Sequence, residues 1–188
     1  MSDSAAKHRA KQTVRNLILS LLVSLGLVVA LVLGVPRDDS NRINPVDYQA
    51  IALEAQASLE QPILSPEVPS DWYSNSARLE NELDVQSWYI GFVTPENQFI
   101  AVTQAFESNP SWLALTLQGN WQDGEVLVEG RSWQIWPTLR PQTPKGTKEY
   151  AMVHEFGSSA VIIYGTADEA DFLILAEAIS KQLDSENY

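Results

Sequence analysis

The feature of this sequence that most constrains its fold is an uncharged apolar run of 20 residues, Asn16 to Val35. As an α-helix the run would be about 30 Å long, which is the thickness of the hydrocarbon core of a bilayer. It has no polar side, unlike the surface helix of a soluble domain. The run is longer than the apolar part of a signal peptide and ends at Pro36 without a small-x-small cleavage pattern. We therefore predict an uncleaved membrane anchor, with a cleaved signal peptide as the alternative.

The flanking charges predict the orientation of this anchor. Residues 1–15 carry four Lys or Arg and one Asp, whereas residues 36–43 carry two charges of each sign. The flank richer in Lys and Arg stays in the cytoplasm. We predict a cytoplasmic basic N-terminus (1–15), a transmembrane helix (16–35), a linker (36–43) and an extracytoplasmic domain (44–188) at the plasma membrane.

The part that follows the anchor is acidic and contains no cysteine. Residues 36–188 carry 8 basic and 23 acidic side chains, a net charge of −15. Such a domain repels the phosphates of nucleic acids, so a nucleic-acid partner is excluded. The lack of cysteine excludes disulfides, thiolate metal sites and thiol nucleophiles. The length of 188 residues fits one globular domain besides the anchor.

Turn signals and β-rich runs predict the fold of the outer domain. Three strand pairs are expected, namely 88–93 with 99–105, 125–129 with 132–136, and 150–156 with 159–165. Three helices are expected, one from Asn44 to before Pro62, a short one capped by Asn109, and one over 166–183 with a Thr166–Glu169 capping box. We interpret 78–85 as a polar connection and 137–149 as an exposed loop. This order predicts an α+β fold, a mainly antiparallel sheet with amphipathic helices on one face.

No pattern of catalytic or metal-binding residues stands out in the outer domain. His154 is its only histidine, and its neighbours in a strand pattern indicate a packed residue. The serines of "FGSSAV" lack the second glycine of a nucleophile elbow. The acidic clusters 80–84 and 168–171 fit a solvated connection and a helix N-terminus. We predict no metal, no cofactor, no catalytic residue and no enzymatic activity.

Six tryptophans lie beyond the anchor, and two of them are candidates for contact with a partner or with lipid. Trp121, in the turn-rich "GNWQDG", is expected to be exposed. In "SWQIWP", strand alternation places Trp133 and Ile135 on one face and Trp136 on the other. Most of the remaining indoles are expected in the core because they bury a large area.

Several segments occur together in a familiar combination. They are the basic N-terminus with one anchor, "PSDWYSNSARL", "WYIGFVTPENQFIAVTQ", and "GRSW" followed by "YGTA" before the last helix. With them the chain resembles a family of uncharacterised actinobacterial single-pass membrane proteins with an extracytoplasmic domain. The resemblance covers essentially the whole chain, and Asp71 stands where the family pattern has a glycine. The marks of the family in this sequence are Trp72, Asn75, Arg78, Trp88, Gly91, Thr94, Pro95, Gln104, Gly130, Trp133 and Gly165.

This resemblance implies the topology and the single domain but no activity. The domain is also similar to the small helix-flanked sheets of the Mog1 and PsbP type, which act mainly as non-catalytic binding or assembly modules. That second likeness is an analogy of folds alone.

Three family positions suggest a binding site. Asn75, Arg78 and Gln104 are uncharged or basic groups beside strand-like segments of an acidic domain, and we predict that they converge. Arg78 then either pairs with a buried carboxylate or forms the polar end of a groove. With Trp121 and Trp136 these residues are the candidate binding residues.

The combined features predict a membrane-anchored, non-catalytic binding or assembly module of the cell envelope, with an envelope protein as partner. The alternative is a binder or carrier of an envelope lipid or glycan. A carboxylate-based hydrolase ranks last, because it needs two acidic groups that face each other across a cleft.

Overall fold

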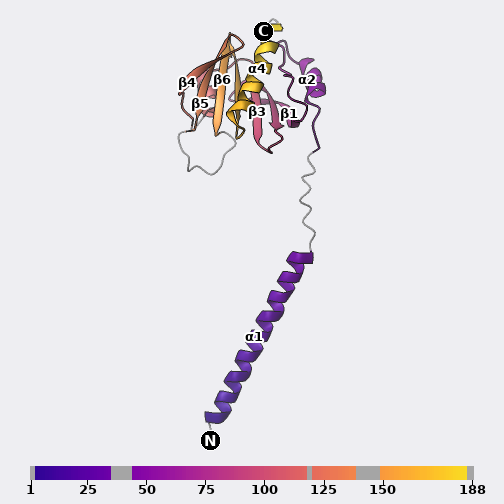
Figure 1. Ribbon diagram of the computed structural model, residues 1–188, viewed down its shortest axis with the longest axis vertical. Coiled ribbons are helices and arrows are strands. Elements are labelled where there is room, and N and C mark those ends of the chain that lie inside the picture. Colours follow the sequence, from indigo (N-terminus) through magenta and orange to yellow (C-terminus); the bar gives the residue numbers. More distant parts are fainter. Residues whose placement is uncertain (1–2, 35–43, 118–119, 139–148, 186–188) are drawn as a thin grey trace. The chain divides into compact units, whose positions relative to one another are not determined.

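A computed structural model of the chain describes residues 3–34, 44–117, 120–138 and 149–185 (Figure 1). The chain divides into two compact units, Met1–Arg42 and Ile43–Tyr188. The first unit contains helix α1 (Asp3–Gly34). The second unit contains helices α2 (Tyr48–Gln56), α3 (Pro110–Thr116) and α4 (Glu169–Ser185). Its strands are β1 (Tyr73–Glu82), β2 (Val85–Val93), β3 (Phe99–Ala105), β4 (Gly124–Val128), β5 (Arg131–Pro137), β6 (Tyr150–Phe156) and β7 (Ser159–Gly165).

Helix α1 is longer than the apolar run that predicts it. It begins at Asp3, so the basic residues that precede the run belong to the same helix. The segment Gln12–Leu31 is long and apolar enough to cross a membrane. A signal sequence near the N-terminus can also meet this criterion of length and composition.

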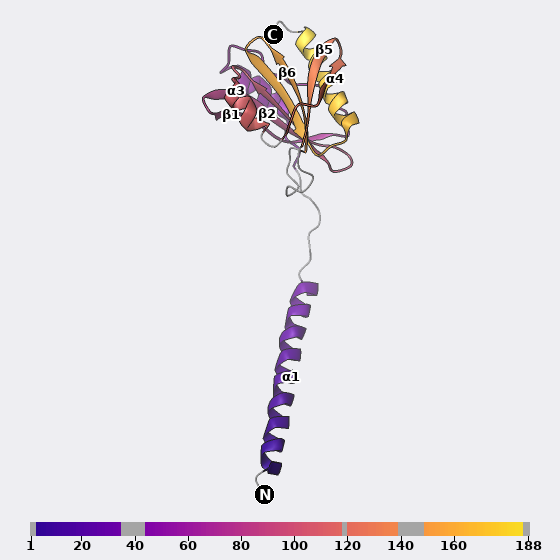
Figure 2. The ribbon, with the colours of Figure 1, turned by 90° about the vertical axis from the view of Figure 1, so that its left-hand side faces the viewer.

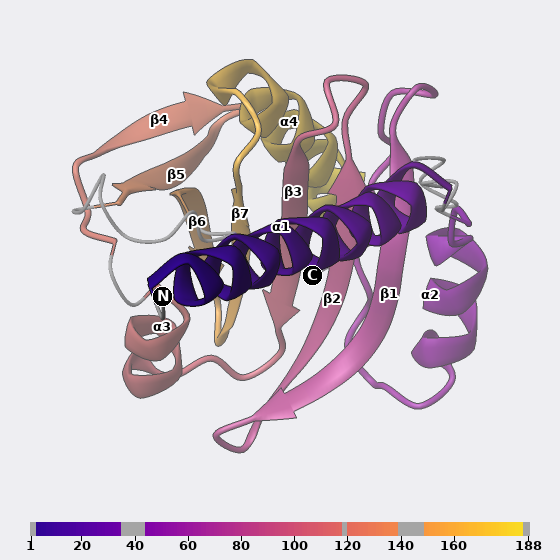
Figure 3. The ribbon, with the colours of Figure 1, turned by 90° about the horizontal axis from the view of Figure 1, so that it is seen from below.

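The seven strands form one antiparallel sheet in the order β1-β2-β3-β7-β6-β5-β4 (Figure 3). Hairpins join β1 to β2 and β2 to β3, after which the chain crosses to the far edge at β4 and returns through β5, β6 and β7. The two halves of the domain therefore meet where β3 pairs with β7. The predicted α+β fold is confirmed.

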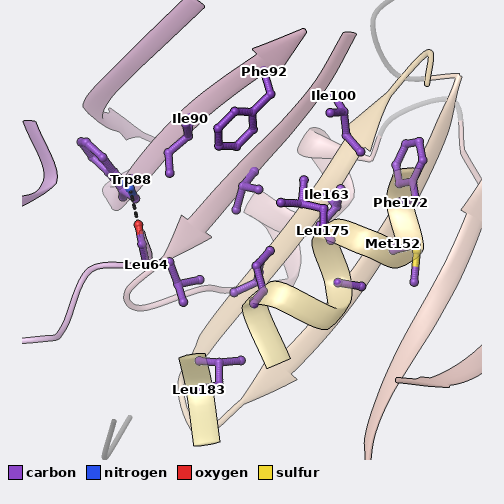
Figure 4. Close-up of a cluster of buried hydrophobic side chains, with 14 of the residues drawn as sticks. Leu64, Trp88, Ile90, Phe92, Ile100, Met152, Ile163, Phe172, Leu175 and Leu183 are labelled. Carbon is purple, nitrogen blue, oxygen red and sulfur yellow. Dashed lines mark hydrogen bonds between the residues drawn. The ribbon is translucent and has the colours of Figure 1, made fainter. Parts of the chain in front are cut away.

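The larger hydrophobic cluster lies between one face of the sheet and helices α2 and α4. Figure 4 shows the part of it between the sheet and α4. Strand alternation directs Trp88, Ile90 and Phe92 of β2 to this face. Helix α4 contributes the predicted stripe of Phe172, Leu175, Ile179 and Leu183, which is buried. The indole Nε1 of Trp88 donates to the carbonyl of Leu64, 2.9 Å away, which ties the segment before β1 to this core.

A second, smaller cluster lies on the opposite face of the sheet. There Trp112 and Leu117, from α3 and its C-cap, pack against Ala105, Val153 and Ile162. Figure 2 shows α3 and α4 on opposite sides of the sheet. The expectation that helices cover one face is therefore wrong. The two tryptophans of "SWQIWP" divide between the faces as predicted, with Trp133 in the larger cluster and Trp136 beside the smaller one.

Two local predictions are corrected by the structure. Residues 78–82, predicted as part of a polar connection, belong to β1, and Leu83 and Asp84 form the tight turn into β2 with positive φ angles. Thr166 does not cap α4, because its hydroxyl accepts from the N–H of Phe99 and donates to Gln98. The predicted cap of α3 is confirmed, since Asn109 Oδ1 accepts from the N–H of Trp112 at 2.9 Å.

Other predicted bounds differ by a few residues or lie outside the described chain. Helix α2 is shorter than expected and is capped by Asp47, whose carboxylate accepts from the N–H of Ala50. Residues 139–148 of the predicted loop lie outside the described residues.

Candidate functional site

The strand register places several polar and aromatic side chains in two rows on the face of the sheet that α3 partly covers. The first row crosses β1, β2 and β3 as Arg78, Tyr89 and Thr103. The second row crosses the same strands and β7 as Ser76, Gly91, Ala101 and Tyr164. We call the surface formed by Asn75, Ser76, Arg78, Tyr89, Gly91 and Tyr164 the Arg78 face.

Arg78 lies over the ring of Tyr89 on this face. Its guanidinium carbon is 4.1 Å from the centroid of the Tyr89 ring, within the range of a cation–π interaction. The same guanidinium forms an ion pair with Glu80 and a hydrogen bond with the hydroxyl of Ser76. The side chains of Arg78 and Glu80 are 50% and 36% exposed. The carboxylate beside Arg78 is therefore not buried, and that version of the prediction is wrong.

Asn75 joins Arg78 on the same face because β1 contains a bulge between Ser74 and Ser76. A Cβ atom added at Gly91 would lie 2.5 Å from Asn75 Oδ1 and 2.9 Å from the hydroxyl oxygen of Tyr89. Both polar groups therefore occupy the space above Gly91 that any other residue would fill. This explains why a glycine stands in the middle of a buried strand.

Gln104 does not belong to this group. It lies on the opposite face, paired with Trp88, and is 1% exposed. Its amide accepts from the N–H of Leu64 and donates to the carbonyl of Pro62, both at 2.8 Å. The predicted convergence therefore holds for Asn75 and Arg78 and is wrong for Gln104, whose contacts are structural.

The tyrosines of the Arg78 face remain protonated near neutral pH. Burial raises the pKa of Tyr89, although the positive charge of Arg78 opposes that rise. Burial also raises the pKa of Tyr164 to about 12, with a further contribution from Tyr89. A protonated phenol can both donate and accept a hydrogen bond, which suits this face to contacts with polar groups.

The two candidate tryptophans lie away from Arg78. Trp136 of β5 lies at the far end of the row that begins at Ser76 of β1. Four strands lie between the two residues, which places them about 24 Å apart at about 4.8 Å per strand. The ring of Trp136 is half-buried and its Nε1 donates to Gln134 at 3.1 Å. Trp121 is 47% exposed, as predicted, and its main-chain N–H donates to Pro137. Their role in binding stays a prediction.

Tyr89 and Tyr164 were not identifiable from the sequence as members of the site. The strand "VQSWYIGFV" is buried on both faces almost throughout, so it lacks the polar alternation that assigns side chains to faces. The only usable signal was Gly91, since a glycine inside a strand indicates a close approach by another group.

A separate set of charged groups joins β5, β6 and α4. Arg131 donates to Asp184 Oδ1 from Nε and from a terminal nitrogen, at 3.1 and 2.7 Å. Its other terminal nitrogen lies 3.4 Å from His154 Nε2, and His154 Nδ1 lies 2.8 Å from the carbonyl oxygen of Ser132. His154 is buried and stacks on Phe156, and burial lowers its pKa. This is the packed histidine that the sequence predicts.

Within residues 3–34, 44–117, 120–138 and 149–185, no group of three or more His, Asp or Glu side chains is placed to hold a metal ion. Searches among curated proteins and among solved structures found no match, so the analogy with the Mog1 and PsbP folds stays a prediction.

A family model, however, matches residues 9–179, which is most of the chain and includes most of α1 and the Arg78 face. The model is described as "Protein of unknown function (DUF4245)". The match extends from the helix α1 through the sheet to the middle of α4, as the resemblance of the quoted segments implies. The chain therefore belongs to the DUF4245 family, a family of proteins of unknown function.

Proposed function

We propose that this protein is a membrane-anchored, non-catalytic binding or assembly module of the cell envelope, and that its outer domain binds an envelope protein through the Arg78 face. Helix α1 then remains attached, with its basic end in the cytoplasm. The linker 36–43 spans at most about 29 Å when fully extended. The domain would thus meet its partner close to the membrane, where tethering raises the effective concentration.

The observation that carries this proposal is the position of Arg78. Its guanidinium is held by a ring, a carboxylate and a hydroxyl, yet half of the side chain stays open to solvent. A side chain held in one orientation loses little entropy on binding. Arg and Tyr are also the residue types enriched at the centres of protein interfaces. An ordered Arg over a Tyr in an acidic domain thus provides a specific contact for a carboxylate or carbonyl of a partner.

Site-specific photo-crosslinking in the native membrane tests the proposal. A benzoylphenylalanine residue at Asn75, on the Arg78 face, is compared with one at Ser158, an exposed residue in the turn between β6 and β7. We expect one discrete protein adduct from position 75 and none from position 158. Adding Arg78→Met should abolish the adduct, while Arg78→Lys should weaken it because Lys keeps the charge without the planar group.

Stability measurements separate loss of binding from unfolding. Arg78 and Glu80 are partly exposed, so Arg78→Met should lower the free energy of unfolding by no more than about 1 kcal/mol. A lipid or glycan adduct in place of a protein would favour the alternative function. Equal adducts at positions 75 and 158, or an adduct that survives Arg78→Met, would refute a role for the Arg78 face.

A further inference from the structure

A groove of about 760 Å³ runs between α4 and the segment that precedes β1. One wall is the segment Ser65–Pro69, and the other is a stripe of α4 that includes Ile174, Ala178 and Gln182. The groove lies outside the Arg78 face, so what it binds is independent of the function proposed above.

The α4 wall follows from helical spacing. Positions 174, 178, 181 and 185 recur every three or four residues, beside the buried stripe of the same helix. Ile174 is 41% exposed, although it is a large apolar side chain on a helix packed against the core. Ala178 is small and lies between it and Lys181, which leaves room for the side chain of a ligand.

The opposite wall is a stretch of extended main chain. Ser65 and Val68 each precede a proline, which keeps their backbone in the extended region. The N–H of Ser65 turns toward α4 and donates to Gln182 at 2.9 Å, while the carbonyl of Pro66 turns the other way and accepts from Tyr48 at 2.7 Å. The carbonyl of Pro66 and the N–H of Val68 both lie near the hydroxyl of Tyr48. We infer that the N–H and the carbonyl of Glu67, which lie between them in the chain, face away from Tyr48 and toward the groove.

These main-chain groups of Glu67 have no protein partner among the described residues of the chain. An extended segment with an unused donor and acceptor along a groove resembles the edge of a sheet, to which an extended peptide adds by main-chain hydrogen bonds. Apolar positions beside the edge, here Val68 and Ile174, then accept side chains of the peptide.

The charges of the groove select the side chain of the ligand. Glu67, Glu177 and Lys181 line it, and Lys181 forms ion pairs with Glu177 and with Glu129. These three carboxylates and one ammonium group leave a local net charge of −2. The whole outer domain also carries a net charge of −15. The groove is thus complementary to a cationic side chain.

We propose that this groove binds an extended peptide segment of a partner protein, in which a Lys or Arg side chain alternates with an apolar one. The peptide runs along Ser65–Pro69 and forms main-chain hydrogen bonds with Glu67. Its basic side chain lies between Glu67 and Glu177, and its apolar side chain packs on Ile174 and Ala178.

Calorimetric titration of the full chain in phosphatidylcholine nanodiscs tests this site, with empty nanodiscs as the blank. The probe is the peptide acetyl-Val-Lys-Val-Lys-Val-amide, and its matched control has Glu in place of Lys. We expect binding of the Lys peptide only, and weaker binding at higher salt. Either Glu67→Gln or Glu177→Gln should weaken binding about 2- to 5-fold, the effect of one partly exposed ion pair. Methylating the main-chain nitrogen of the central Val of the probe should also weaken binding, because it removes a main-chain hydrogen-bond donor of the peptide.

Ala178→Trp should abolish binding because the indole fills the groove, whereas Ala170→Trp, exposed on α4 outside the groove, should not. Hydrogen exchange of the unmutated chain gives an independent readout, in which the amide of Glu67 becomes protected when the peptide is bound. No binding of the Lys peptide, equal binding of the Glu peptide, or protection elsewhere without protection at Glu67 would each overturn the proposal. The crosslinking at position 75 and the peptide titration test different surfaces. A negative result in one experiment therefore does not refute the proposal tested by the other.

Discussion

The buried amide of Gln104 helps to hold the segment before β1 against the sheet, together with the indole of Trp88. Replacing Gln104 with Met keeps the volume but leaves the buried N–H of Leu64 and the carbonyl of Pro62 without their partner. We expect Gln104→Met to lower the free energy of unfolding by about 2–4 kcal/mol, because each unpaired group costs about 1–3 kcal/mol. Denaturant unfolding measures the change. Gln86→Met, exposed on the neighbouring strand, is the control and should change it by less than about 0.5 kcal/mol.

Gly165 of β7 lies directly against the main chain of β3. A Cβ atom there would lie 2.1 Å from the carbonyl oxygen of Phe99 and 2.8 Å from the Cα of Ile100. The backbone cannot yield as a side chain can, so we expect Gly165→Ala to destabilise the domain by about 3 kcal/mol. Gly124→Ala, where an added Cβ meets nothing, should preserve the melting temperature. Equal melting temperatures for the two variants would contradict this account.

At the scale of elements, the Arg131–His154–Asp184 contacts join β5 and β6 to the end of α4. Burial, and the adjacent charge of Arg131, lower the pKa of His154 in the folded chain. As the pH falls, the imidazole of His154 therefore takes up a proton near pH 6.5 in the unfolded chain, whereas in the folded chain it does so only at a lower pH. The free energy of unfolding should fall as the pH drops below about 6.5 toward the folded pKa.

Denaturant unfolding at pH 7.5 and 5.5 measures this dependence. His154→Gln should remove that part of the pH dependence, whereas His8→Gln, which changes the only other histidine, should not. Burial raises the pKa of Asp171, so this carboxylate contributes to the pH dependence with the opposite sign. Asp171 is present in both the unmutated chain and His154→Gln, so the difference between the two reports His154 alone. An unchanged pH dependence in His154→Gln would show that another group is responsible.

The elements that could be predicted from the sequence are those with a local signal. The β2–β3 and β6–β7 hairpins have β-rich runs around a turn, and α3 has both a capping Asn109 and Pro110. Strand β1 was missed because an edge strand with one open face tolerates the Ser, Asn and Glu residues that otherwise indicate a loop. Strand β1 forms because it pairs with β2, and this pairing depends on the whole sheet and not on the local sequence of β1.

The candidate site was predictable only in part, for the same reason. Arg78 and Asn75 could be selected as polar residues in an acidic domain, but their common face depends on a bulge that no local pattern indicates. Gln104 has the same polar character but lies on the other face. Successive side chains of a strand point to opposite faces, and position 104 points to the same face as Trp88. Thr166 has a capping-box sequence, yet its hydroxyl bonds to β3 because the register of β7 brings it there.

At the scale of the whole molecule, the orientation of α1 can be tested without background because the chain has no cysteine. Single variants Ser4→Cys and Ser58→Cys are treated in intact cells with a maleimide that does not cross membranes. We expect labelling at position 58 at once, and at position 4 only after permeabilisation. Detection of position 4 in the 20.9 kDa chain also shows that α1 is retained. A shortened chain without position 4 would show that α1 is a signal peptide.

The pairing of β3 with β7 also has a consequence for how the domain is made. Strand β3 lies in the middle of the finished sheet, but its second neighbour is synthesised roughly 60 residues later, which takes about 3–12 s. If β1, β2 and β3 pair during that interval, they form an open sheet whose free edge is the apolar strand β3. A chain that stalls between Ala105 and Gly165 would then be a template for other unfinished copies, so nascent chains would have to be kept apart until the last hairpin is made.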